Sequence, residues 1–562
     1  MRRLGSRLIN INRVFFFVLV VYVFDSSAQA KYGGGKGTAA EPYQIFTAEH
    51  MQEIGTNPPD WKKYFKLMDD IDLGGYTGTT FNLIGNISKP FTGVFDANGH
   101  TISNFRYGSN GVNFIGIFAY VDGVDAEIKN MRLINPHVDA GTGHSVGSLV
   151  GHFGDGSIAN CHVDSGEVSG NYVGGLVGYY TATMITSCTV EDSNISGGSC
   201  VGGLVGYGSG VITDCHSICT VSGFDKIGGL VGYAQGPEIS NCYSIADVNA
   251  SGHYVGGLAG RSTAVLLKSY SEGNVRGYHE VGGLVGRNTR DILRCFSFSN
   301  VFCDAAGGGL VGYNEGEILF CYATGTVSGT AVLGGLVGGS YYPGNVVKCY
   351  ASGDVEGGEE VVGGLSGWNY GTISDCYATG SVVCGNRVVG GLVAGMGNIS
   401  GAGIVDNCYA IGSVSGNLEV GGLVGRNSSG TVTDSFWDIE TSGEQSSMGG
   451  IGLTTVELQT LSTFTSAGWD FAGEVINGPN DIWDICEGTN FPKFVWQIPV
   501  GDFVCPDGVA FVDFSILGSA WMSSFGQLNW NPNCDISKPN DNVIDERDLN
   551  VFTENWLAGS YN

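Results

Sequence analysis

The sequence predicts an all-β protein built around a parallel β-helix of about a dozen three-strand coils, capped at both ends and followed by a small α-helical module. Three observations predict this fold. A glycine-rich hexamer, VGGLVG at Val173–Gly178, recurs at intervals of 26 to 31 residues. Each interval contains three short strand-like pieces separated by glycine. A cysteine or serine returns at nearly the same place in each interval. Such a period is typical of solenoids, in which every repeat adds one coil.

The bulk composition narrows the class of protein. A chain of 562 residues is too long for one ordinary core, so several domains or a solenoid are expected. Its 94 glycines follow no three-residue period, which excludes collagen, and 43% hydrophobic residues argue against disorder. The net charge of −28 argues against nucleic-acid binding, because no basic stripe is available for phosphates. This acidity suits an exported protein, calcium binding or solubility alone.

Residues 1–30 have the pattern of a secretory signal peptide. Four arginines precede an apolar run at Val14–Phe24, and small residues lead up to a cleavage site after Ala30. The run is too short to remain as a membrane anchor. We therefore expect a protein that is secreted or displayed at the cell surface, with no transmembrane anchor once the signal is cleaved.

Residues 31–113 are expected to form an N-terminal cap and the first irregular coils. Thr47–Ile54 predicts a short helix with Thr47 as its N-cap and Gly55 as its stop. Strand-like pieces separated by Gly, Asn and Asp turns follow the helix. A solenoid needs an atypical first repeat to cover the open end of its core.

Residues 114–437 are expected to form the regular coils. Three glycines in six residues exclude a helix for the hexamer, because each glycine costs about 1 kcal/mol in a helix interior. Parallel coils would stack about 4.8 Å apart, with glycines at corners that need positive φ. The hexamer copies begin at Ile115, Val146, Val173, Val201, Ile227, Val255, Val281, Gly307, Leu333, Val362, Val389 and Val420.

Cysteine forms a second column through the repeats. Two interpretations are open: a metal or redox column, or a ladder of small buried side chains that tolerates serine. Packing is favoured, because free cysteine behaves as a small hydrophobe and no CxxC or Cys/His cluster is present. The column comprises Cys161, Cys188, Cys215, Cys242, Cys295, Cys321, Cys349, Cys376 and Cys408, with Ser269 and Ser435 in two copies.

No catalytic residues are predicted on the rod, because charged residues are thinly scattered and no nucleophile motif or carboxylate pair at fixed spacing is present. The position after the hexamer is occupied by tyrosine or arginine in several coils. This alternation is consistent with an ordinary solvated edge, or with a strip that stacks on sugars or holds acidic polymers. The residues are Tyr179, Tyr207, Tyr233, Arg261, Arg287, Tyr313 and Arg426. Four histidines (His144, His152, His162 and His216) are assigned to different places in their repeats.

The glycine hexamers resemble the GLUG repeat family of bacterial surface and adhesin-like proteins. The resemblance covers Ile115 to Gly425. It implies an exported β-solenoid with a binding or structural role, and it supplies no substrate and no catalytic residues.

Residues 438–498 break the period and are expected to form a C-terminal cap. Thr454 and Glu457 have the spacing of a capping box that opens a short helix to about Leu461. Aromatic residues among turn residues follow it, and a compact cap over the last coil accounts for them.

Residues 499–562 contain a duplication at an offset of 35 residues. Each copy has an acidic loop followed by apolar residues spaced as one face of a short helix. We expect the two helices to share a small core. The matching residues are Phe514, Leu517 and Trp521 in the first copy and Leu549, Phe552 and Trp556 in the second.

The acidic loops predict calcium sites, because oxygen ligands at alternating positions, a backbone carbonyl and a helix-opening carboxylate suit Ca²⁺. The alternative is an acidic turn favoured by the helix dipole. The first loop is degenerate, and Cys505 and Cys534 beside the two loops are candidates for a disulfide. The second loop offers Asp535, Ser537, Asp541, the Val543 carbonyl, Asp545 and Asp548, and the first offers Asp502, Asp507 and Asp513.

This tandem loop–helix pair resembles a type I dockerin over residues 502–558, although its loop lengths depart from the family. The resemblance implies Ca²⁺ binding and docking onto a cohesin domain, with Glu546 and Arg547 contacting the partner. The alternative is a module that only stabilises the C-terminus.

The sequence favours a secreted or cell-surface, non-enzymatic β-solenoid, adhesin-like or carbohydrate-binding, that attaches to a partner through its calcium-dependent module. Two alternatives remain. One is a polysaccharide-active enzyme, a lyase or glycoside hydrolase, since β-helices also carry such sites. The other is a purely structural surface protein.

Overall fold

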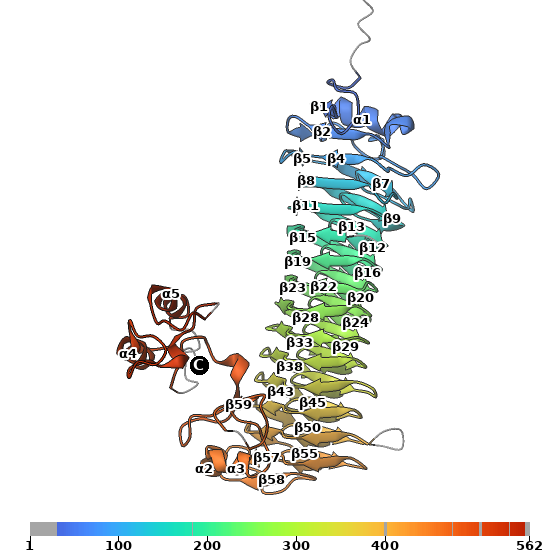
Figure 1. The fold of residues 1–562 in the computed structure, drawn as a ribbon. Helices are drawn as coiled ribbons and strands as arrows, with labels where there is room; N and C mark the ends of the chain where they lie inside the picture. The colour runs from blue at the N-terminus through green and yellow to red at the C-terminus, as the bar shows by residue number, and fades with distance from the viewer. Residues whose placement is uncertain are drawn as a thin grey trace, which may run out of the picture.

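Parallel pairing between equivalent segments of successive repeats builds a long rod (Figure 1). The computed structural model describes residues 31–181, 184–397, 402–474, 476–504, 509–538 and 540–556, so the expected signal peptide lies outside the described residues. The predicted fold class is confirmed: the rod is a parallel β-solenoid of about 14 turns. Within the described ranges, no helix is long and apolar enough to cross a membrane.

One face of the rod is a separate 12-stranded sheet. Each of its strands begins near the end of a hexamer and continues past it. Its register repeats from coil to coil, as in Val177↔Val205 and Val205↔Val231. The strands are β7 (Phe118–Val121), β10 (Val150–Phe153), β13 (Val177–Tyr180), β17 (Val205–Gly208), β21 (Val231–Ala234), β25 (Ala259–Ser262), β30 (Val285–Asn288), β35 (Val311–Asn314), β40 (Val337–Ser340), β45 (Ser366–Asn369), β50 (Val393–Met396) and β55 (Val424–Asn427).

The remaining faces belong to one 46-stranded sheet, whose long strands in the early coils, such as β15 (Thr189–Gly197), are replaced by shorter strands in the later coils. Residues with a left-handed backbone conformation, such as Arg294, separate these strands. One coil, for example, consists of β31 (Ile292–Leu293), β32 (Phe296–Ser297), β33 (Asn300–Cys303) and β34 (Ala306–Gly308), followed by β35.

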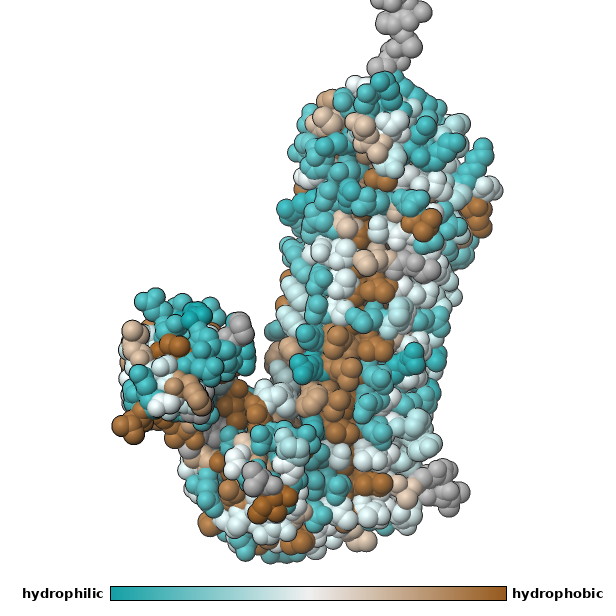
Figure 2. All heavy atoms as spheres, in the orientation of Figure 1, coloured by the Kyte–Doolittle hydropathy of each residue, from teal (hydrophilic) through white to brown (hydrophobic). Residues whose placement is uncertain are grey.

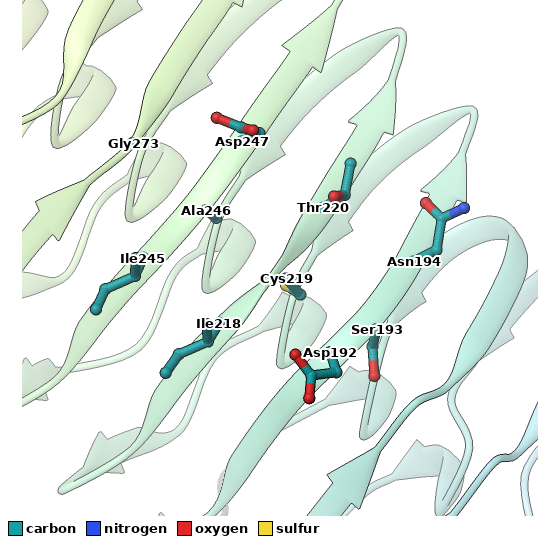
Figure 3. A pocket seen from close by; sticks show the side chains of 10 residues that line it. All are labelled: Asp192, Ser193, Asn194, Ile218, Cys219, Thr220, Ile245, Ala246, Asp247 and Gly273. Carbon is teal, nitrogen blue, oxygen red and sulfur yellow. The ribbon is translucent and has the colours of Figure 1, made fainter.

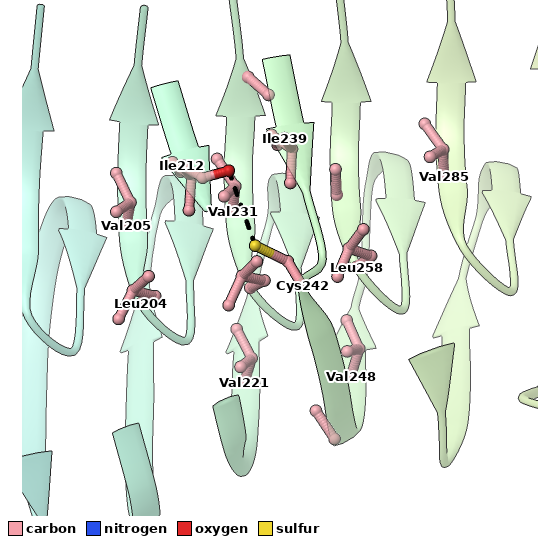
Figure 4. Packing of buried hydrophobic residues seen from close by; sticks show 14 of the residues in the cluster. Leu204, Val205, Ile212, Val221, Val231, Ile239, Cys242, Val248, Leu258 and Val285 are labelled. Carbon is pink, nitrogen blue, oxygen red and sulfur yellow. Dashed lines mark hydrogen bonds between the residues drawn. The ribbon is translucent and has the colours of Figure 1, made fainter. Parts of the chain in front are cut away.

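The core is a column of aliphatic side chains that repeats along the axis (Figure 4). Val205, Val231 and Val285 occupy equivalent strands, and all three are fully buried. Leu204 and Leu258 repeat beside them in the same way. Each coil therefore buries its apolar face only against its neighbours, as expected for a solenoid.

The cysteine column is buried, which confirms the packing interpretation, and it also bonds successive coils. The backbone N–H of Cys188 donates to Sγ of Cys215 at 3.3 Å. The N–H of Cys242 donates to the hydroxyl of Ser269 at 3.1 Å. Serine is therefore accepted here for its hydrogen bonding as well as its size. Burial raises the pKa of the Cys295 thiol in this column to about 12.

The hexamer glycines were expected at corners that need positive φ, but the structure requires them for a different reason. None of those at Gly202, Gly203 and Gly206 has positive φ. A Cβ on Gly203 would lie 2.1 Å from the carbonyl oxygen of Gly229 in the next coil. The requirement is therefore close approach of backbones, while residues such as Asn241 occupy the left-handed corners.

The N-terminal cap contains α1 (Ala48–Thr56), whose N-cap Thr47 accepts a hydrogen bond from His50 N–H, as predicted. Gly55 lies inside the helix and does not end it. Strands β1 (Tyr43–Ile45), β2 (Tyr64–Leu67) and β4 (Val94–Asp96) already pair in parallel with one another, so the coils begin next to this helix.

The C-terminal cap begins after β58 (Ile451–Leu453), which extends the parallel sheet beyond Trp437. The predicted capping box is confirmed: Thr454 and Glu457 exchange hydrogen bonds at the start of α2 (Thr455–Leu458). Helix α3 (Leu461–Thr465) follows it. The cap and the last coils share an aromatic core that comprises Tyr377, Tyr409, Phe436, Leu458, Phe464, Trp469, Phe471, Trp483 and Phe494.

Candidate functional site

The residues that follow the hexamers lie next to one another, coil by coil, on the 12-stranded sheet. The register pairs Tyr233 with Arg261, Arg261 with Arg287, and Arg287 with Tyr313. The strip expected from the sequence is therefore continuous in space. We call it the motif column, and its members are Tyr120, His152, Tyr179, Tyr207, Tyr233, Arg261, Arg287, Tyr313, Gly339, Trp368, Gly395 and Arg426.

The first part of the motif column is a stack of parallel rings. Ring centroids lie 4.2 Å apart between Tyr120 and His152 and 4.8 Å apart between His152 and Tyr179. Tyr179 and Tyr207 follow at 4.7 Å. Stacked rings cover each other's faces, so they present edges and polar atoms to solvent. Burial lowers the pKa of His152 to about 4, which leaves this part of the column uncharged at neutral pH.

The stack breaks at Tyr233, whose ring is perpendicular to that of Tyr207. Two arginines follow. The guanidinium of Arg261 lies 5.1 Å from the ring centroid of Tyr233, and that of Arg287 lies 4.3 Å from the centroid of Tyr313. These cation–π contacts hold each guanidinium against the ring of a neighbouring coil. The motif column therefore has a neutral segment and a cationic segment.

A buried carboxylate lies beside the two arginines. Glu280 is 6% exposed, and its Oε1 lies 3.6 Å from Nη1 of Arg287. Its Oε2 has no hydrogen-bond partner, and the Nε atoms of Arg261 and Arg287 also have none. Burial raises the pKa of Glu280 to about 7, although both arginines oppose that shift. Arg287 also pairs with Glu315 at 3.1 Å.

A second column was not predicted from the sequence, although its pattern is simple. It consists of the residues that directly follow the cysteines and serines of the cysteine column. His162 and His216 both belong to it, so the assignment of these histidines to different places was wrong. We call it the tyrosine column: His162, Thr189, His216, Tyr243, Tyr270, Phe296, Tyr322, Tyr350, Tyr377, Tyr409 and Phe436.

The C-terminal cap covers the end of the tyrosine column. Tyr377 and Tyr409 are buried there, and Trp483 lies 6.2 Å and 6.1 Å from their ring centroids. Where the cap ends, Trp496 and Tyr322 help to line a cavity of about 300 Å³. Figure 2 shows apolar side chains in an interrupted lengthwise strip on the face of the rod toward the viewer.

A groove of about 550 Å³ crosses β15 (Thr189–Gly197), β19 (His216–Gly223) and β23 (Tyr243–Ala250) (Figure 3). It holds two carboxylates, Asp192 and Asp247, with Cys219 and Thr220 of the middle strand between them. Asp247 Oδ1 accepts hydrogen bonds from Asn274 at 2.9 and 3.2 Å. One oxygen of Asp247 is therefore already bonded to the next coil.

The C-terminal module contains the two predicted helices, α4 (Phe511–Ala520) and α5 (Glu546–Glu554). They share a core in which Leu517 and Phe552 are buried, as predicted from the duplicated spacing. The two loops repeat one arrangement. Asp513 accepts hydrogen bonds from the N–H groups of Phe503 and Ala510, and Asp548 accepts them from Ile536, Ser537 and Asp545.

In the second loop, Asp548 accepts hydrogen bonds from the N–H groups of Ser537 and Asp545, and Asp535 accepts one from the N–H of Asn542. Asp535 and Ser537 are buried, and one carboxylate oxygen of Asp535 has no hydrogen-bond partner, which suits a cation. Arg547, predicted to contact a partner, is exposed; it also contacts Asp541, and its Nη2 lies 3.0 Å from Asp545. Its neighbour Glu546 is exposed. Among the described residues, no group of three His, Cys, Asp or Glu side chains is already arranged around a metal position.

In the first loop, Asp502 and the buried Asp513 lie within the described residues, and Asp507 lies outside them. The candidate disulfide between Cys505 and Cys534 is wrong, because Cys534 is a buried free thiol. Cys486 of the cap is the disulfide-bonded cysteine.

Comparisons with known proteins agree with the repeat analysis. A protein of Evansella cellulosilytica named as a Gly-rich membrane protein is 31% identical over 157 residues, which cover 26% of this chain and 18% of that protein. Halomucin of Haloquadratum walsbyi is 32% identical over 156 residues, which cover 26% of this chain and 2% of halomucin. The similarity thus spans a small part of each relative.

A crystal structure described as an immunoglobulin A1 protease from Bacteroides ovatus matches 84% of this chain and 96% of its own, at 18% identity and a TM-score of 0.27. The family model for the GLUG motif matches residues 169–196, 227–249 and 358–383. The β-solenoid of this chain therefore carries GLUG-motif repeats.

Proposed function

We propose that this protein is a surface β-solenoid that binds extended glycans along the motif column in an adhesin-like role. The observation that carries the proposal is the straight line of ring and guanidinium groups on one sheet, one per coil from Tyr120 to Tyr313. A spacing of about 4.8 Å between coils repeats these groups along a polymer-sized surface. A rod with repeated weak contacts suits a repeating ligand.

The chemistry of the neutral segment supports a hydroxyl-rich ligand. Ring edges and phenol hydroxyls offer hydrogen-bond donors and acceptors beside apolar carbon, the combination that sugars present in return. Gln235 donates to the hydroxyl of Tyr233 at 2.7 Å and accepts from that of Tyr207, so these hydroxyls are held in place. Sugars would therefore meet a preorganised row of polar atoms.

The test is glycan binding by the full chain and by Tyr179→Ala/Tyr207→Ala. The double variant removes two ring edges and two hydroxyls from the neutral segment, so affinity should fall about tenfold or more. A matched control is Tyr243→Ala/Tyr270→Ala, which removes an equally stacked pair, 5.0 Å apart, from the tyrosine column on the other sheet. Glycan arrays followed by titration calorimetry measure both.

Equal losses in the two double variants would contradict a site on the motif column. Release of shorter oligosaccharides from a bound polysaccharide would replace the binding function with the enzymatic alternative. Silence against neutral and acidic glycans alike would favour a purely structural rod.

We further propose that the C-terminal module binds Ca²⁺ and attaches the secreted protein to a cohesin-type partner. The buried Asp535 with its unpartnered oxygen and the equivalent roles of Asp513 and Asp548 support this proposal. If Ca²⁺ binds, Asp535, Ser537, Asp541, Asp545 and Asp548 would hold it with the Val543 carbonyl. The ion would then supply the positive charge that fixes the loop.

Calcium titration of the chelator-treated full chain tests this module. We expect Asp535→Asn to abolish uptake at the second loop, because it removes a buried ligand charge. Arg547→Ala should instead tighten uptake about fivefold, since the guanidinium competes with the cation for Asp541 and Asp545. Asp304→Asn, an exposed rod carboxylate, is the control. No calcium uptake by the unaltered chain would refute the site and leave the glycan proposal untouched.

A further inference from the structure

We propose that Arg261 and Arg287 form a subsite for the anionic group, a carboxylate or a sulfate ester, of an acidic polysaccharide, and that Glu280 competes with that group. The inference rests on the proposed glycan binding and names the class of glycan. It concerns only the cationic segment of the motif column, where the ring stack is interrupted.

The two arginines are placed as a pair. They occupy equivalent positions on β25 and β30, adjacent strands of the sheet. Tyr233 lies against the guanidinium of Arg261 on one side, and Tyr254 lies 5.8 Å from it on the other. Planar guanidinium groups held against rings keep their N–H edges for bidentate bonds to carboxylate or sulfate oxygens. The pair therefore offers two such edges one coil apart.

Their charges are incompletely matched within the protein. Among the described residues, no carboxylate lies within 4.0 Å of Arg261, whereas Arg287 contacts Glu280 and Glu315. Buried polar atoms normally have partners, but the Nε atoms of both arginines and Oε2 of Glu280 have none. His279 also faces Glu280, with Nδ1 3.7 Å from Oε1. An anion laid along the column would supply Arg261 with the counter-charge that no carboxylate of the described residues gives it.

Glu280 acts as the internal competitor, because it is a buried carboxylate beside the same guanidinium. Its pKa of about 7 shows that its charged form is poorly stabilised even there. At pH 8 the ionised group holds Arg287, and an incoming anion has to displace that contact. Replacing Glu280 by glutamine keeps the shape and removes the charge.

The experiment is calorimetric titration of the full chain at pH 8 with three hexasaccharide probes: oligogalacturonate, its methyl ester and a sulfated galactan. We expect oligogalacturonate or the sulfated probe to bind about tenfold more tightly than the neutral ester, and the stronger of the two identifies the anionic group. Arg261→Gln should remove that preference. Glu280→Gln should strengthen anion binding about fivefold, and Glu280→Gln/Arg287→Gln should cancel the gain.

The design keeps the variants folded and separates the two proposals. Arg261 has no ion pair with another described residue to lose, and the double variant leaves no unpaired carboxylate at position 280. Unchanged preference in Arg261→Gln, with neutral glycans still lost in Tyr179→Ala/Tyr207→Ala, would overturn the subsite and leave glycan binding standing. Equal binding of poly-glutamate would overturn the assignment to a polysaccharide. Absence of binding to every probe would overturn both.

Discussion

Gly283→Ala should prevent two neighbouring coils from stacking and cost about 4 kcal/mol or more of local stability. An added Cβ at Gly283 would lie 2.0 Å from the carbonyl oxygen of Gly309 and 2.3 Å from Oγ of Ser297. The backbone oxygen of Gly309 is held close, because the N–H of Gly283 bonds to the neighbouring Gly308 O at 3.0 Å and the coils on either side fix the spacing. The methyl group therefore has to push β30 away from β35.

Hydrogen exchange measured strand by strand is the suitable readout, because a solenoid need not unfold in one step. Protection should fall over Val281–Val311 and persist in distant coils. Gly108→Ala is the control, since nothing lies within 4 Å of the added Cβ and φ is not positive. Protection in Gly283→Ala equal to that of the unaltered chain would show that the hexamer glycines are not set by backbone approach.

Trp469→Ala should detach the C-terminal cap. The Trp469 side chain is fully buried, its ring centroid lies 4.8 Å from that of Phe464 and 4.9 Å from that of Trp483, and its Nε1–H donates to Asp434 O at 2.9 Å. Removing a buried tryptophan costs about 3–5 kcal/mol. The last coils, once uncovered, would expose an unpaired sheet end that promotes association between rods.

Light scattering after size-exclusion chromatography measures that association, with thermal unfolding in parallel. We expect Trp469→Ala to form concentration-dependent oligomers. Trp496→Ala, which removes a ring that is 38% exposed, should stay close to the unaltered chain. A monomeric Trp469→Ala with unchanged unfolding would mean that the cap contributes nothing to closing the rod.

Periodicity made the rod predictable. A residue that returns once per coil must return to the same place on the surface, so Tyr233, Arg261 and Arg287 could be aligned from spacing alone. The tyrosine column obeys the same rule and was accessible by the same means. The contact of Glu280 with Arg287 was not, because Glu280 comes just before its hexamer and Arg287 just after it, and spacing alone does not show that these two side chains meet.

The ends of the chain were less predictable for a physical reason. Loops at the C-terminus have no neighbouring repeat to fix their register, so spacing identifies the helices but not which groups meet. The contact of Arg547 with Asp541 and Asp545 within its own loop is an example. The hydrogen bond from the N–H of Cys242 to the hydroxyl of Ser269 was also not predicted, because the small size of serine was enough to explain its place in the column.

The cysteine column has a consequence for how such a molecule changes over generations. At six steps of the column, a backbone N–H of one coil donates to the sulfur or hydroxyl at the equivalent position of the next coil. Deleting or duplicating one whole unit leaves that exchange intact at the new junction. The rod can therefore be lengthened or shortened by whole coils. Its length can change by mutation without any change in the two caps or the C-terminal module.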